Sequence, residues 1–79
     1  MIKNVYEYVK DNEFRFTVFN DRIHVINYKR IISLQDDDIS FLGDDKKIVV
    51  KGKGLTLNKM LDDEVLILGS VTKIEVFNV

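Results

Sequence analysis

The sequence predicts an all-β domain of short, mostly antiparallel strands, forming a small sandwich, roll or barrel, with a short helix at the N-terminus. From residue 14 onward, β-prone apolar runs recur about every eight to ten residues, which is typical of these architectures. Clusters of Asp, Asn and Gly separate the runs, and these residues favour turns. Proline is absent from the 79 residues, so every predicted strand keeps its backbone donors.

The chain has the length and composition of one small domain, which we place at residues 1–79. Its 12 basic and 13 acidic residues give a formal net charge of -1, which provides no overall attraction to nucleic acid or anionic lipid. The absence of cysteine excludes a disulfide framework and a thiolate metal site. No apolar run approaches the ~20 residues of a membrane-spanning helix, and the first residues lack a secretory signal pattern. These features predict a cytoplasmic protein.

The N-terminal segment has a different periodicity from the rest of the chain. Ile2, Val5, Tyr6 and Val9 follow the i, i+3, i+4, i+7 spacing of one helix face. We therefore expect an amphipathic helix over residues 1–11. A helix this short is marginal alone and must dock on the sheet or on a partner.

Alternation of apolar and polar residues begins at Phe14, where the β domain over residues 14–77 starts. Asn20 and Asp21 interrupt the alternation and predict a two-residue hairpin turn. The predicted register pairs Val18 with Ile23, Phe16 with Val25 and Thr17 with His24. One face of this hairpin is apolar, as a sheet that covers a core requires.

The remaining strands are predicted at residues 31–34, 39–42, 47–51, 55–59, 64–68 and 72–77. Turns are predicted between them at residues 36–37, 43–45, 52–54, 62–63 and 69–70. Gly52-Lys53-Gly54 reads as a tight reversal between two strands, because glycine reaches positive φ easily. Residues 65–68 are apolar on both faces and predict a central or doubly covered strand.

Two features resemble binding or catalytic sites but have simpler structural interpretations. His24 is the only histidine, and no serine, carboxylate or second ligand stands at a recognisable spacing from it. We expect a structural or surface histidine. Gly52 and Gly54 lie beside lysines and invite comparison with a phosphate-binding loop. That loop requires a Gly-Lys-Ser/Thr sequence and a following helix, whereas Leu55 opens a β-prone run, so the turn is favoured.

The acidic residues cluster at predicted turns, in residues 36–38, 44–45 and 62–64. Their spacing matches no calcium-binding loop, so they are expected to be solvated turn residues rather than a divalent-ion site. We assign no catalytic, cofactor-binding or metal-ligating residue, and we expect neither a cofactor nor enzyme activity.

An alternative function is the binding of single-stranded nucleic acid by a small β-barrel, through stacked aromatic and basic side chains. The candidate residues are Phe19, Tyr28, Phe41, Arg15, Arg22, Lys29 and Arg30. The acidic charge balance and the need for aromatic residues in the core argue against it, so nucleic acid is not an expected partner.

A chain of hairpins this small leaves strand edges open, and open edges pair with other chains. Lysines near the predicted edges either protect them or border an assembly surface: Lys29, Lys46, Lys47, Lys51, Lys53, Lys59 and Lys73. The partners we expect are another protein, or a second copy of the chain through an exposed edge.

Several motifs follow one another in a recognisable order. They are Asn27-Tyr28-Lys29 with Ile31-Ile32, the acidic turn at residues 36–38 with Ile39, the segment I-V-V-K-G-K-G-L-T-L at residues 48–57, and the segment D-E-V-L-I-L-G-S-V at residues 63–71, which continues through Ile74 to Phe77. Residues 23–77 resemble the YabP/YqfC family of sporulation proteins of endospore-forming Firmicutes, and are closer to YqfC. The match covers about two thirds of the chain and leaves the N-terminal segment outside.

The resemblance implies a small, non-enzymatic protein that is needed for endospore formation. It implies a structural, assembly or protein-interaction role in the mother cell, peripheral at the forespore envelope, with a membrane protein of the sporulation programme as a partner. It transfers no catalytic or ligand-binding residues.

Overall fold

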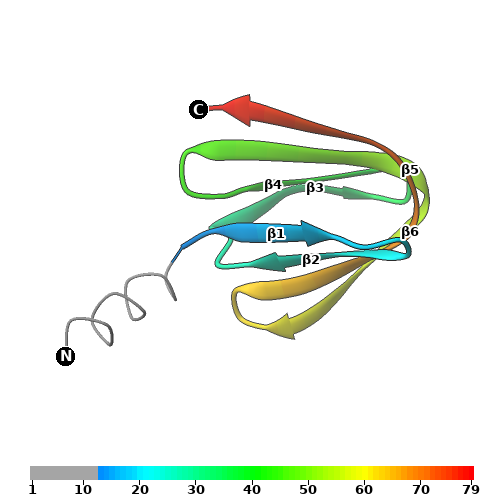
Figure 1. Cartoon of the computed structure of the whole chain (residues 1–79), viewed down its shortest axis with the longest axis horizontal. Coiled ribbons are helices and arrows are strands. Elements are labelled where there is room, and N and C mark those ends of the chain that lie inside the picture. The colour runs from blue at the N-terminus through cyan, green and yellow to red at the C-terminus, as the bar shows by residue number, and fades with distance from the viewer. Residues whose placement is uncertain (1–12) are drawn as a thin grey trace.

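The computed structural model describes residues 13–79, and the helix expected at residues 1–11 lies outside them. The described chain is all-β and forms a six-stranded antiparallel sheet (Figure 1). Its strands are β1 Arg15–Val18, β2 Arg22–Ile26, β3 Arg30–Gln35, β4 Asp38–Leu42, β5 Lys46–Leu61 and β6 Glu64–Asn78. The strand order is β1-β2-β6-β5-β4-β3. Within this part of the chain, no helix has the length and apolar character needed to cross a membrane.

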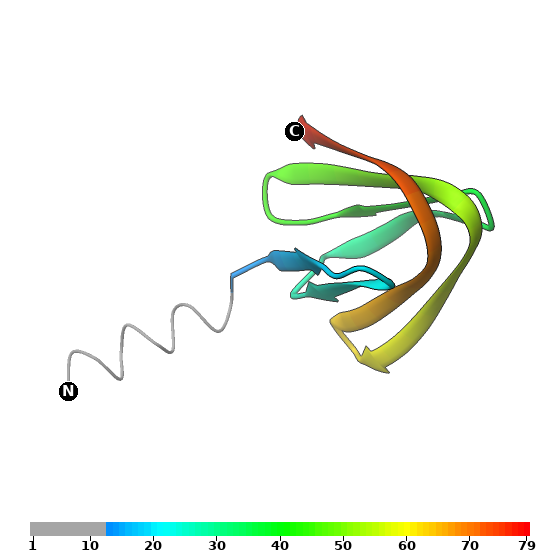
Figure 2. The same cartoon turned by 45° about the vertical axis from the view of Figure 1, so that its right-hand side comes forward.

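Two strands, β5 and β6, are long enough to run through both halves of the molecule. Residues 46–51 of β5 pair with β4 and with residues 73–78 of β6. After a bend, the end of β5 pairs with the start of β6, which also pairs with β2. The bend, clearest in Figure 2, folds one sheet into two halves that share a core.

The sequence prediction of strand reversals at residues 52–54 and 69–70 was wrong. Both segments lie inside continuous strands, β5 and β6. Gly54 and Gly69 do have positive φ angles, 62° and 128°, but they serve the bend. Register shifts between Lys51 and Gly52 and between Lys53 and Thr56 insert extra residues into the ladder, which bends the strands. A bulge uses the same glycine freedom as a turn, so the local sequence does not separate the two.

The other predicted turns and the first hairpin are confirmed. Two-residue turns form at Asn20-Asp21, Asp36-Asp37, Asp44-Asp45 and Asp62-Asp63. The predicted pairs are all present in the β1–β2 register: Val18 with Ile23, Phe16 with Val25 and Thr17 with His24. Residues 65–68 lie between β2 and β5, as predicted for a central strand.

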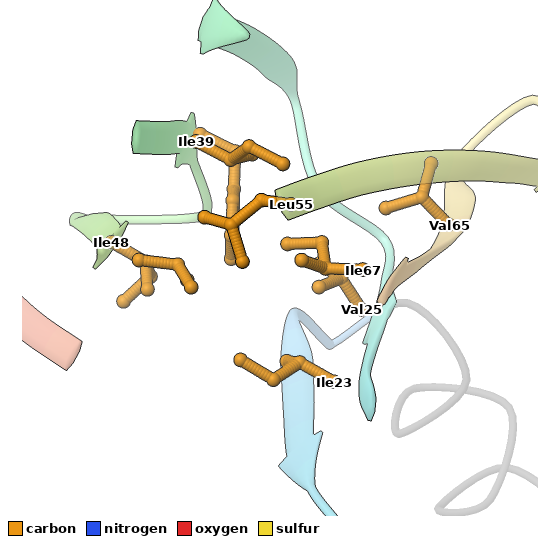
Figure 3. Close-up of a cluster of buried hydrophobic side chains, with 9 residues drawn as sticks. Ile23, Val25, Ile39, Ile48, Leu55, Val65 and Ile67 are labelled. Carbon is orange, nitrogen blue, oxygen red and sulfur yellow. The ribbon is translucent and has the colours of Figure 1, made fainter. Parts of the chain in front are cut away.

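The core lies between the two halves of the bent sheet (Figure 3). Its buried side chains are Ile23, Val25, Val65 and Ile67 from one half, Ile39, Phe41, Ile48 and Val50 from the other, and Leu55 at the bend. Phe14 and Phe16 pack on Phe41, with ring centroids 6.1 and 6.5 Å from it. Full burial of one such aliphatic side chain contributes about 1.5–3 kcal/mol, so this cluster is a major source of the sheet's stability.

Candidate functional site

Within residues 13–79, the bent sheet has four strand edges. Strands β1 and β3 are the two ends of the strand order. The bend opens two more edges, because in this part of the chain residues 73–78 of β6 pair only with β5, and residues 56–61 of β5 pair only with β6. An open edge presents backbone donors and acceptors that another strand can use.

Three of these edges carry features that oppose strand addition. Strand β1 is only four residues long. Strand β3 is interrupted by a register shift between Ile31 and Ser33, and the edge of β5 by another between Lys59 and Leu61. Short strands and bulges are the usual means by which proteins protect sheet edges.

The fourth edge, which we call the β6 edge, comprises residues 73–78. It pairs with β5 in unbroken register, from Lys51 opposite Lys73 to Lys46 opposite Asn78. Val76 and Phe77 are 52% and 47% exposed there. The two charged side chains of the edge pair with each other, since Lys73 Nζ lies 3.3 Å from Glu75 Oε2. The β6 edge is therefore regular, partly apolar and locally neutral.

The backbone of the β6 edge is oriented for a further strand. Val79 donates its N–H to the carbonyl oxygen of Asp45, at 3.0 Å, which marks residues 45 and 79 as a hydrogen-bonded pair. Hydrogen-bonded and non-hydrogen-bonded pairs alternate along an antiparallel ladder. Ile74, Val76 and Asn78 consequently direct their N–H and C=O groups away from β5, to the open side. This arrangement can accept an antiparallel strand.

His24 lies on β2, on the face of the sheet opposite the core. Its Nε2 contacts Oε2 of Glu64 at the start of β6, and the two side chains are 28% and 23% exposed. Glu64 is 40 positions further along the chain, so the sequence alone does not identify it as the partner of His24. The pairing of β2 with β6 brings the two side chains together. No group of three His, Cys, Asp or Glu side chains within residues 13–79 could hold a metal ion. The contact joins two strands of one half of the sheet.

The acidic clusters lie at turns, as predicted, and their backbone and side chains bind parts of the sheet. The carbonyl oxygens of Asp37 and Asp36 accept the N–H groups of Gly52 and Leu55, at 3.2 and 2.8 Å, which holds the β3–β4 turn on the bend of β5. Asp44 Oδ1 lies 3.8 Å from Lys29 Nζ. Both of these side chains are exposed, so their ion pair contributes little to stability.

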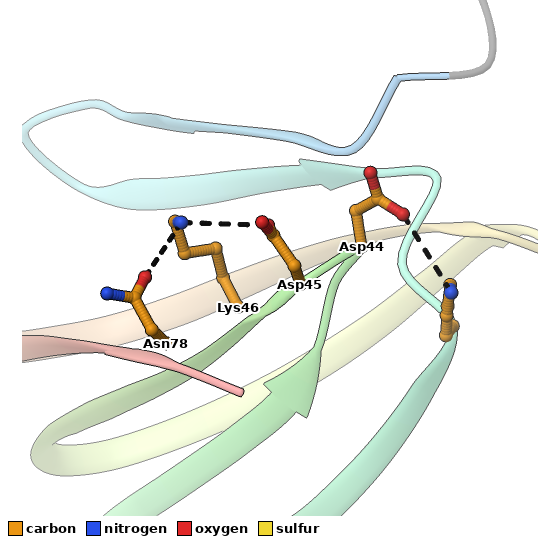
Figure 4. A network of polar contacts seen from close by, with 5 residues as sticks. Asp44, Asp45, Lys46 and Asn78 are labelled. Atoms are coloured by element: carbon orange, nitrogen blue, oxygen red, sulfur yellow. Dashed lines mark hydrogen bonds and ion pairs between the residues drawn. The ribbon is translucent and has the colours of Figure 1, made fainter.

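A second set of contacts joins the β4–β5 turn to the end of the β6 edge (Figure 4). Lys46 Nζ lies 3.6 Å from Asp45 Oδ1 and donates to Asn78 Oδ1 at 2.8 Å. Asn78 is also opposite Lys46 in the β5–β6 register. These contacts hold the last residue of the β6 edge in line with β5.

Two of the aromatic residues considered for nucleic-acid binding have rings that are buried or partly covered. Phe41 is fully buried, so its ring is not accessible to a base. The guanidinium carbon of Arg22 lies 4.2 Å from the ring centroid of Phe19 and covers one face of that ring, although Phe19 remains 44% exposed.

The chain matches no protein-family model, no curated protein and no solved structure. The geometry of the described residues therefore carries the functional argument, and the β6 edge is its strongest element.

Proposed function

We propose that this protein is a non-enzymatic assembly module of endospore formation, which binds a protein strand at the β6 edge. The observation that carries the proposal is the contrast between this edge and the other three. Those edges are short or bulged, whereas residues 73–78 are regular and expose Val76 and Phe77. Strand addition gives affinity through main-chain hydrogen bonds and specificity through alternate side chains.

The resemblance of residues 23–77 to the YabP/YqfC proteins supports the sporulation part of the proposal. Its two longest motifs, residues 48–57 and 63–77, fall on β5 and β6, the strands that form the bend and the β6 edge. On this proposal the protein acts in the mother-cell cytoplasm, peripherally at the forespore envelope. A membrane protein of the sporulation programme is then one of its partners.

Deletion of the gene in the source organism tests the proposal. We expect the deletion strain to grow normally and to form no mature spores. The wild-type gene should restore sporulation, and so should the Val18→Glu variant, which alters a side chain that is 54% exposed on the β1 edge. Val76→Glu makes the same change on the β6 edge and should not restore sporulation. Normal spores from the deletion strain would contradict the role in sporulation, and full rescue by Val76→Glu would contradict the role of the edge.

A further inference from the structure

The outward-facing backbone of the β6 edge is self-complementary. We infer that its occupant is the β6 edge of a second copy of this chain, paired antiparallel about a twofold axis. The inference rests on the proposed function, because it names the partner at the same edge. A twofold contact uses one surface twice and closes at two copies.

The backbone directions restrict the register of such a pair. Only Ile74, Val76 and Asn78 direct their N–H and C=O groups to the open side, so these residues must lie opposite one another in the two copies. One register that meets this condition places Val76 opposite Val76 of the second copy and Ile74 opposite Asn78. It pairs residues 74–78 of the two copies with one another and places Lys73 opposite Val79.

Two shifted registers are equally close to this one. A shift that places Val76 opposite Asn78 of the second copy pairs only residues 76–78 of the two edges with each other. A shift that places Ile74 opposite Val76 of the second copy would also place Glu75 opposite its own equivalent. Like charges directly opposite one another destabilise a strand pair. In the register with Val76 on the axis, Glu75 lies opposite Phe77, and no like charges are opposed.

The composition of the edge also suits a second copy. Because Lys73 and Glu75 pair on their own strand, two copies approach without net charge repulsion. Pairing covers Val76 and Phe77, which are about half exposed in the single chain. The bulges in β3 and β5 and the shortness of β1 oppose further strand addition, so the assembly ends at a dimer.

The oligomeric state of the full chain, measured by light scattering and sedimentation from micromolar to millimolar concentration, tests the inference. The wild-type protein should be a dimer. Val76→Glu and Val76→Lys each place two like charges opposite one another at the twofold axis. Each should raise the dissociation constant of the dimer by about tenfold or more. Mixing these two variants should restore a dimer, because opposite charges then face each other. Val18→Glu is the matched control and should dimerise like the wild type, and circular dichroism checks that every variant is folded.

A wild-type protein that is monomeric throughout the concentration range would overturn the inference. So would a Val76→Glu variant that dimerises as tightly as the wild type. If the wild type is monomeric but Val76→Glu still fails to restore sporulation, the proposed function stands and the occupant is a strand of another protein. If Val76→Glu abolishes the dimer and yet restores sporulation, the dimer stands and the proposed role of the edge fails.

Discussion

Gly52 and Ser70 approach so closely at the bend that a Cβ on residue 52 would lie 2.0 Å from the carbonyl oxygen of Ser70. The neighbouring atom is backbone, which cannot rotate away as a flexible side chain can. Residue 52 therefore has to be glycine for β5 and β6 to keep their spacing while they bend. The constraint arises from packing between strands, since Gly52 has no positive φ angle.

Substitution of Gly52 tests this packing constraint. Gly52→Ala should lower the free energy of unfolding by roughly 1–3 kcal/mol, because the strands must separate to admit the methyl group. Urea unfolding measures the change. Gly54→Asn is the control, since no atom lies within 4 Å of a Cβ there and Asn tolerates the φ of 62°. Equal stability of Gly52→Ala and the wild type would contradict the close approach.

The contact between Gly43 and Phe14 ties the β4–β5 turn to the residue that precedes β1. A Cβ on Gly43 would lie 2.5 Å from the Phe14 ring, so Gly43→Ala should displace that ring from Phe41 and cost about 1 kcal/mol or more. In a Phe14→Leu background the same substitution should cost less, because the obstructing ring is absent. A double-mutant cycle by urea unfolding measures the difference. Identical costs in both backgrounds would show that Phe14 does not occupy this position.

The contact of His24 with Glu64 should contribute to stability because it is partly shielded from solvent. Single and double alanine substitutions at the two positions should give a coupling energy of roughly 0.5–1 kcal/mol at neutral pH. Thr17→Ala is the control on the same face, opposite His24 in the β1–β2 register. If the effects of the two alanine substitutions on the free energy of unfolding are simply additive, the two side chains do not interact in solution and the prediction is wrong.

Nucleic-acid binding should be absent from the purified protein. Phe41 is buried, Arg22 covers one face of Phe19, and the net charge is -1, so two of the three candidate stacking rings are lost or reduced and the protein as a whole does not attract nucleic acid. Filter binding against single-stranded DNA and RNA at low salt measures this. Binding that weakens steeply as salt rises would contradict the prediction and favour the alternative function.

Features that depend on neighbours within a few residues were predictable from the sequence. The β1–β2 register follows from a two-residue turn and local alternation, and the aspartate turns from their composition. The bend was not predictable, because it requires Gly52 to approach Ser70 and Gly69 to approach Gly54, across two strands. The partner of His24 and the β6 edge were missed for the same reason. Both depend on the strand order, which places residues far apart in the sequence side by side.

Strand β6 is held on both sides at its start and on one side at its end. Residues 64–68 lie between β2 and β5, with Val65 and Ile67 fully buried, whereas residues 73–78 pair with β5 alone among the strands that the structure describes. A protein bound to the open end would be connected to the interior through one continuous peptide backbone. Force directed along that backbone would load the hydrogen bonds between β5 and β6 in shear. A partner attached at this end of β6 would therefore transmit such a force to the buried half of the strand.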